Sequence, residues 1–186
     1  APYNGAVNPY YIPASYGTAL FGGDAVTKTG TANTAAVEAP GAGSFAVATR
    51  PAVAKTAAGA GNPITGVVVG FAAEPGNLES THNPANNERV VLVCDDPDVL
   101  FEIQASAAIT AANIGLNAAL LDDNAGRPET GMSGTELNAA TVAATAGLQL
   151  KLMRVVNRPD NEAGLTNVKV EVAINNHTEA TGVAGI

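Results

Sequence analysis

Few residues in this chain of 186 amino acids have the type and spacing that catalysis or metal binding requires. The two histidines, His82 and His177, lie in polar stretches, and we interpret both as solvated side chains rather than as bases. Cys94 is the single cysteine. It has no Cys or His at metal-ligand spacing and no basic neighbour to lower its thiol pKa, so it predicts neither a zinc site nor a nucleophile.

Two short motifs come closer to a functional pattern, but their spacing fails. Residues 131–134 contain a serine, yet they are one residue short of a G-x-S-x-G nucleophile elbow and follow no apolar strand. Residues 95–98, with Glu102 beyond them, supply carboxylates but lack the glycine and glutamate positions of a calcium loop. We therefore expect an acidic turn there, no catalytic residue, no metal and no cofactor, and a protein that is not an enzyme.

Composition and charge exclude further classes of function. Hydrophobic residues make up 46% of the chain, but alanine is prominent among them, and alanine buries little area. The length predicts one domain, or one domain with an arm. A core with so much alanine buries little apolar area for a domain of this size, and this favours a chain that relies on partners. Nine basic against 17 acidic residues give a net charge of -8 without any basic stretch, so we expect no nucleic-acid partner.

The sequence also lacks the signals of export and of membrane insertion. Residues 1–4 show neither the basic nor the apolar region of a signal peptide, and the most apolar run, residues 66–73, is far shorter than the roughly 20 residues that span a bilayer. A lone cysteine is typical of a reducing compartment. We expect synthesis in a cytoplasm and no membrane partner.

Apolar alternation predicts a chain of strands without a long helix. The expected strands are residues 64–71, 88–94, 99–104, 148–156 and 168–174. We expect the second and third to pair as a hairpin across the acidic turn, and the last two to pair as another. In the final strand, the side chains expected to face the core are Val168, Val170, Val172 and Ile174. Residues 109–114 predict one helical turn. The fold class is therefore all-β, a small barrel or sandwich over residues 24–174.

The two ends of the chain are predicted to be extended arms. Residues 1–23 hold several prolines, which exclude a helix, and all four tyrosines of the protein. The arm either folds back over its own domain or reaches a neighbouring subunit, where tyrosine is enriched. Residues 175–186 predict a polar C-terminal tail. The candidate interface residues are Tyr3, Tyr10, Tyr11, Ile12 and Tyr16.

Residues 89–104 resemble the V-x-D-D-P-(D/N)-x-x-(F/Y)-E-(I/V)-Q hairpin of structural proteins in tailed-bacteriophage particles. The tyrosine-rich opening, residues 66–71 and residues 150–162 fit the same resemblance. It implies a head decoration, or cement, protein: a small β-rich subunit on the outside of the capsid, bound to the major capsid protein and made in the cytoplasm of a bacterial host. It implies no enzymatic residue.

Other readings of the same residues remain open. The protein could belong to the tail or neck of the particle, and copy number would separate these positions. A receptor- or carbohydrate-binding β-domain is a further alternative, although sugar binding favours exposed aromatic platforms and the chain has no tryptophan. We also expect a homodimer or homotrimer, because a thin core gains from burying an interface of about 800 Å² per partner.

Overall fold

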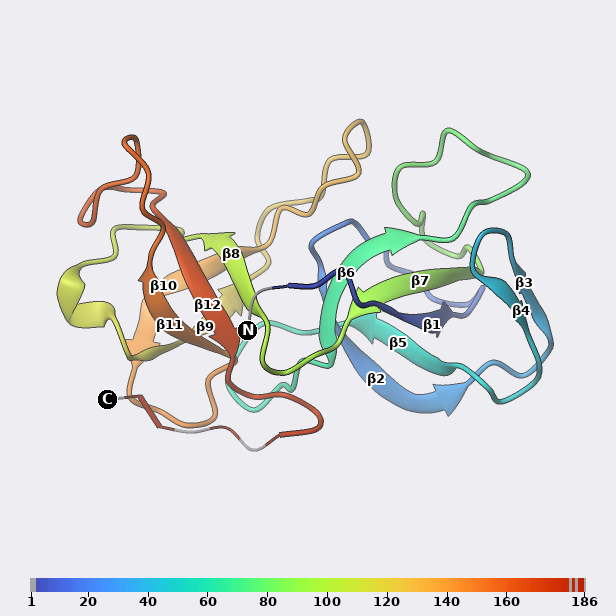
Figure 1. The fold of residues 1–186 in the computed structure, drawn as a ribbon, viewed down its shortest axis with the longest axis horizontal. Helices are drawn as coiled ribbons and strands as arrows, with labels where there is room; N and C mark the ends of the chain where they lie inside the picture. Colours follow the sequence, from blue (N-terminus) through green and yellow to red (C-terminus); the bar gives the residue numbers. More distant parts are fainter. Residues whose placement is uncertain (1–2, 181, 183, 186) are drawn as a thin grey trace.

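The computed structural model describes residues 3–180, 182, 184 and 185, and it confirms the all-β fold class (Figure 1). Within these residues the chain forms twelve strands and one short 3₁₀ helix. In chain order they are β1 (Asn8–Ile12), β2 (Ala25–Ala32), β3 (Val37–Ala39), β4 (Gly43–Phe45), β5 (Pro51–Lys55), β6 (Gly66–Phe71), β7 (Arg89–Cys94), β8 (Leu100–Gln104), η1 (Ala111–Asn113), β9 (Asn117–Leu121), β10 (Glu136–Ala143), β11 (Leu150–Val155) and β12 (Lys169–Ile174).

The first half of the chain closes into a barrel with the strand order β1-β5-β2-β6-β7. Its strands are short and rich in β-branched residues, which suit a pleated, buried surface. The residues that fill the interior are Tyr10, Ile12, Leu20, Val26, Val53, Val68, Val91 and Val93. The hairpin of β3 and β4 covers a second apolar cluster, which contains Val37, Phe45 and Val90, on the outside of this barrel.

The N-terminal arm predicted over residues 1–23 is wrong for its described part. β1 is a strand of the barrel: it runs antiparallel to β7, with Tyr10 opposite Val91, and parallel to β5. Ile12 is fully buried. The prolines do keep this segment extended, as expected. An extended segment with apolar side chains can, however, also pair as a strand between β5 and β7 and so close the barrel. Residues 1 and 2 lie outside the described residues.

The second half forms a five-stranded sheet in the order β10-β9-β11-β12-β8. The predicted hairpin of the last two strands is confirmed as β11 and β12, with Leu150 opposite Ile174. All four side chains predicted to face the core, Val168, Val170, Val172 and Ile174, are buried. The predicted helical turn is present as η1. β9 and β10 fall in a stretch whose alternation was too weak to predict strands.

The other predicted hairpin is wrong, because β7 and β8 belong to different sheets. β7 is paired on both edges, with β1 and with β6, so no edge remains for β8. The connection between them crosses from the barrel to the sheet. Asp95 holds its start against β1 by accepting hydrogen bonds from Asn8 Nδ2 and Tyr10 Oη. The two β units therefore divide at residues 95–99, inside the single domain predicted over residues 24–174.

The two units share a core and a buried polar junction. Ala25 and Ile64, from the barrel half, belong to the same apolar cluster as the buried side chains of the sheet. Gln149 is fully buried: its Nε2 donates to the carbonyl oxygens of Ala57 and Asn62, and its Oε1 accepts the N–H groups of Gly59 and Leu120. Moving the two units apart would leave this buried amide without its hydrogen-bond partners, which costs free energy. The junction therefore holds the two units in a fixed arrangement.

The predicted C-terminal tail is also partly wrong. Asn175 and His177 are buried, and His177 forms a parallel bridge with Ile64. The N–H of Thr178 donates to the carbonyl of Ile64 at 3.0 Å. The start of this segment thus lies against the junction of the two units instead of extending from the surface. Residues 181, 183 and 186 of the predicted tail lie outside the described residues.

Candidate functional site

The predicted interface residues do not form one surface. Tyr10, Tyr11 and Ile12 are buried in the protein's own barrel, Tyr16 is half-buried, and Tyr3 is exposed at the junction of the two units. The Tyr11 hydroxyl donates to Glu88 at 2.5 Å. Burial, together with this hydrogen bond, raises the pKa of Tyr11 to about 12. Tyr10, Tyr11 and Ile12 therefore stabilise the barrel and do not form a surface that a partner could bind.

The residues whose side chains could act in catalysis or bind a metal are also far apart. Burial raises the pKa of the Cys94 thiol, which lies inside the barrel wall. His82 is partly exposed and stacks on Phe21 with 4.8 Å between ring centroids, whereas His177 is buried, so the prediction of a solvated side chain is wrong for His177. Among the described residues, no three His, Cys, Asp or Glu side chains gather as they would around a metal ion. No helix in the part of the chain that the structure describes is long and apolar enough to cross a membrane.

A buried ionic cluster joins the barrel to the loop that precedes β10. Asp24 is fully buried and lies 3.2 Å from Lys55 Nζ, which also lies 2.6 Å from Asp122. Burial alone would lower the pKa of Lys55, but the hydrogen bond to Asp122 and the charges of both carboxylates raise it. Ser133 Oγ donates to Asp24 at 2.5 Å, and Thr135 bridges the two carboxylates. The cluster holds residues 122–135 in place, and these residues wall a groove.

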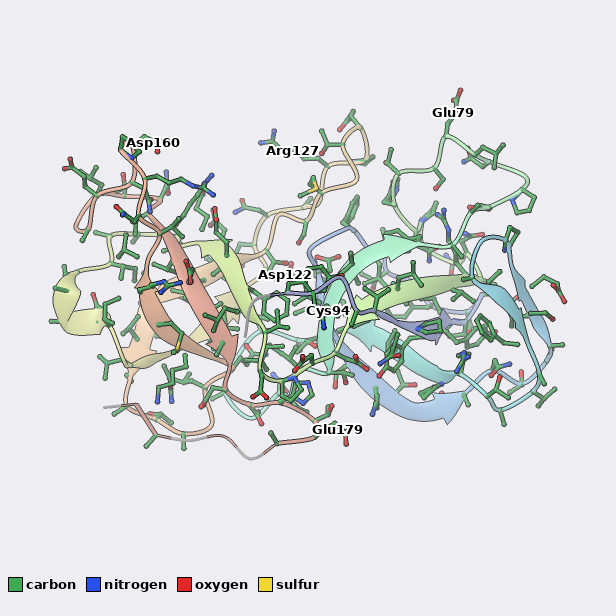
Figure 2. The ribbon with its side chains drawn as sticks, viewed as in Figure 1. Glu79, Cys94, Asp122, Arg127, Asp160 and Glu179 are labelled. Atoms are coloured by element: carbon green, nitrogen blue, oxygen red, sulfur yellow. The ribbon has the colours of Figure 1, made fainter. Side chains whose placement is uncertain are left out.

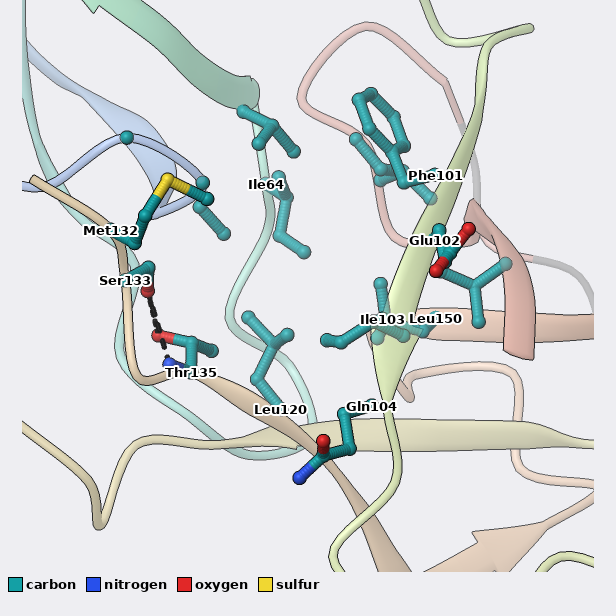
Figure 3. Close-up of a pocket in the computed structure, with 16 residues that line it drawn as sticks. Ile64, Phe101, Glu102, Ile103, Gln104, Leu120, Met132, Ser133, Thr135 and Leu150 are labelled. Atoms are coloured by element: carbon teal, nitrogen blue, oxygen red, sulfur yellow. Dashed lines mark hydrogen bonds between the residues drawn. The ribbon is translucent and has the colours of Figure 1, made fainter. Parts of the chain in front are cut away.

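The groove consists of three adjoining cavities along β8, and Figure 3 shows the residues that line the middle one. The middle cavity, of about 280 Å³, has an apolar lining that includes Ile64, Leu120 and Leu150. It shares Phe101 and Glu102 with a cavity of about 220 Å³ beside Tyr3. Toward the other end, a more polar cavity of about 620 Å³ shares four lining residues with it: Gln104, Met132, Ser133 and Thr135. The groove therefore follows β8 from end to end.

A second candidate surface is made by three long connections, residues 72–88, 122–135 and 156–168, which project to the same side of the molecule (Figure 1). Figure 2 places Glu79, Arg127 and Asp160 on this side, one on each connection. We call it the loop face. Each connection exposes one large apolar side chain: Leu78 is 79% exposed, Met132 58% and Leu165 53%. Long ordered loops on a rigid scaffold commonly carry binding residues.

Hydrogen bonds order two of these connections. Arg89 is buried beneath the first, where its Nε donates to the carbonyl of Ala72 and its Nη1 donates to the carbonyl of His82. Thr81 Oγ1 donates to the carbonyl of Pro128 at 2.6 Å and so joins the first connection to the second. The length of these connections and their isolated apolar residues are the signal in the sequence that could have identified the loop face.

Comparisons with known proteins add no relative from which a role could be transferred. No protein-family model matches the sequence, and searches of curated proteins and of solved structures found no match. The groove and the loop face are therefore interpreted from their own residues and geometry.

Proposed function

We propose that the protein is a structural component of a tailed-bacteriophage particle that binds the outside of the head shell and strengthens it. The resemblance of residues 89–104 to virion structural proteins supports this role. The observation that carries the proposal is the loop face, where apolar side chains stand exposed on ordered connections of a two-part β frame. The partner is the major capsid protein, and the location is the capsid surface.

The exposed side chains of the loop face would stabilise a complex by leaving water on binding. Covering a Leu or Met side chain stabilises a complex by about 1.5–3 kcal/mol before other terms. The connections that hold Leu78 and Met132 are already hydrogen-bonded to each other, so less conformational entropy is lost when they dock. An ordered face with a few apolar anchors suits a protein that must resist the outward pressure of packaged DNA.

Particles stripped of the protein test the role directly. They should release DNA at a lower temperature than complete particles, and adding back the purified protein should restore the difference. Cryo-EM of the complete particle should show hundreds of copies on the head, whereas a few or a dozen copies at the tail or neck would replace this proposal with the alternative position. Equal heat resistance with and without the protein would contradict a cementing role.

Self-association is part of the same proposal. A homodimer or homotrimer would add a buried interface to a protein whose sequence is rich in alanine, which buries little apolar area. Sedimentation equilibrium of the purified chain measures this, and a monomer at concentrations near those in the particle would contradict it.

A further inference from the structure

Among the residues that the structure describes, the edge of the second sheet that borders the groove is unpaired over most of its length. β8 is the last strand in the order β10-β9-β11-β12-β8, and within this part of the chain its strand partner is β12. At its far end the edge is closed, because Ala105 bridges Leu137 and the N–H of Ser106 donates to the carbonyl of Leu137. The open part therefore covers residues 100–103, roughly 13 Å at 3.3 Å per residue.

The register shows which backbone groups point into the groove. The N–H of Ala105 donates to the carbonyl of Val168, directly opposite it in the continued ladder of β8 and β12. Hydrogen-bonded and non-hydrogen-bonded pairs alternate in an antiparallel ladder. Ile103 and Phe101 therefore also bond β12, whereas the N–H and C=O groups of Glu102 and Leu100 point away from β12, toward the groove.

From this edge and the groove beside it, we infer that the protein binds an extended segment of another protein, which pairs with β8 as an additional strand. Backbone hydrogen bonds to Leu100 and Glu102 would supply affinity, and the cavities on either side would receive alternate side chains. The middle cavity is mostly apolar and is lined by the exposed Met132, and the exposed Val69 lines the adjoining cavity beside Tyr3. Figure 3 shows Met132 and Thr135 across the cavity from Phe101 and Ile103.

Charge specifies the occupant further. Glu102 and Glu136 line the groove, and Arg127 is the one basic residue among the described residues that line its three cavities. The chain as a whole has a net charge of -8. Glu102 contacts Arg158 at 2.8 Å, but both side chains are exposed, so exchanging this partner costs little. The segment that fits is extended, with apolar side chains two residues apart and a Lys or Arg near Glu102.

This inference goes beyond the proposed particle role and does not depend on it. The test uses the full-length protein, immobilised, and a display library of random 12-residue peptides. Peptides enriched over a blank surface are then measured against wild type, Glu102→Pro and Glu102→Gln by fluorescence anisotropy. Proline removes the N–H that points into the groove but leaves the ladder with β12, and edge strands tolerate proline at such positions. Glutamine is the matched control, because it keeps that N–H.

We expect affinity for Glu102→Pro to fall at least tenfold and affinity for Glu102→Gln to fall less than threefold. Equal binding to wild type and Glu102→Pro, equal losses in the two variants, or no enriched peptide would each overturn strand addition. Amide hydrogen exchange of the wild type keeps the test valid if the proline variant unfolds. Bound peptide should slow exchange at the Glu102 amide and leave Ile103, which already bonds β12, unchanged; an unaffected Glu102 amide would overturn the inference.

Discussion

At the scale of single residues, Ile12 shows how the role of the N-terminal segment changes once the barrel is seen. It is fully buried in the barrel interior, next to Tyr10 and Val91. Ile12→Ala should lower the free energy of unfolding by about 2–5 kcal/mol, because it removes buried apolar area and leaves a cavity. Urea unfolding measures this. Val47→Ala, at a residue 56% exposed, is the control, and equal small effects in both variants would contradict burial of β1.

Tyr11 makes stability depend on alkaline pH. Burial and the Glu88 hydrogen bond raise its pKa from 10.0 to about 12 in the folded protein. Folding therefore favours the neutral phenol. The contribution of Tyr11 to the free energy of unfolding is complete below pH 10 and is lost as the pH rises from 10 toward 12. Urea unfolding at pH 9 and pH 11 should show a smaller loss of stability for Tyr11→Phe than for wild type. The same loss in both proteins would contradict this account.

At the scale of elements, β1 completes the barrel and cannot be removed. Deleting residues 1–12 takes away a strand that pairs with both β5 and β7, and it exposes two unpaired edges. This variant should be unfolded or aggregated, as judged by circular dichroism and gel filtration. Deleting residues 1–6, which precede β1, is the matched control and should keep a cooperative thermal transition. A folded, monodisperse protein lacking residues 1–12 would restore the idea of a free arm.

The elements also show how far the sequence alone could lead. The β11–β12 hairpin was predictable because its strands alternate strictly and lie close in sequence. The β7–β8 hairpin was predicted on the same grounds and is absent, since the pairing of β7 depends on β1, more than 70 residues away. Strand existence is a local property, but the choice of partner is not. The groove could not be predicted for the same reason: it forms between β8 and Met132, which only the topology brings together.

At the scale of the whole molecule, the ionic cluster around Lys55 connects the two β units. Lys55→Met would leave Asp24 fully buried without its cation, and breaking such a buried pair costs about 3–5 kcal/mol. The melting temperature should therefore fall by several degrees. Lys28→Met, which removes the more exposed pair with Glu179, is the control and should change it little. Equal shifts in the two variants would show that the cluster does not contribute to the junction.

The central claim is that the loop face attaches the protein to the shell of a phage head. The most direct test compares occupancy on stripped particles for wild type, for the triple variant Leu78→Ala, Met132→Ala and Leu165→Ala, and for a control with Val47→Ala and Met153→Ala, both exposed elsewhere. Quantitative mass spectrometry of purified particles measures bound copies. We predict full occupancy for wild type and the control and at least a tenfold weaker binding for the triple variant. Wild-type protein that fails to bind the particles, or a triple variant that binds as well as wild type, would contradict the claim.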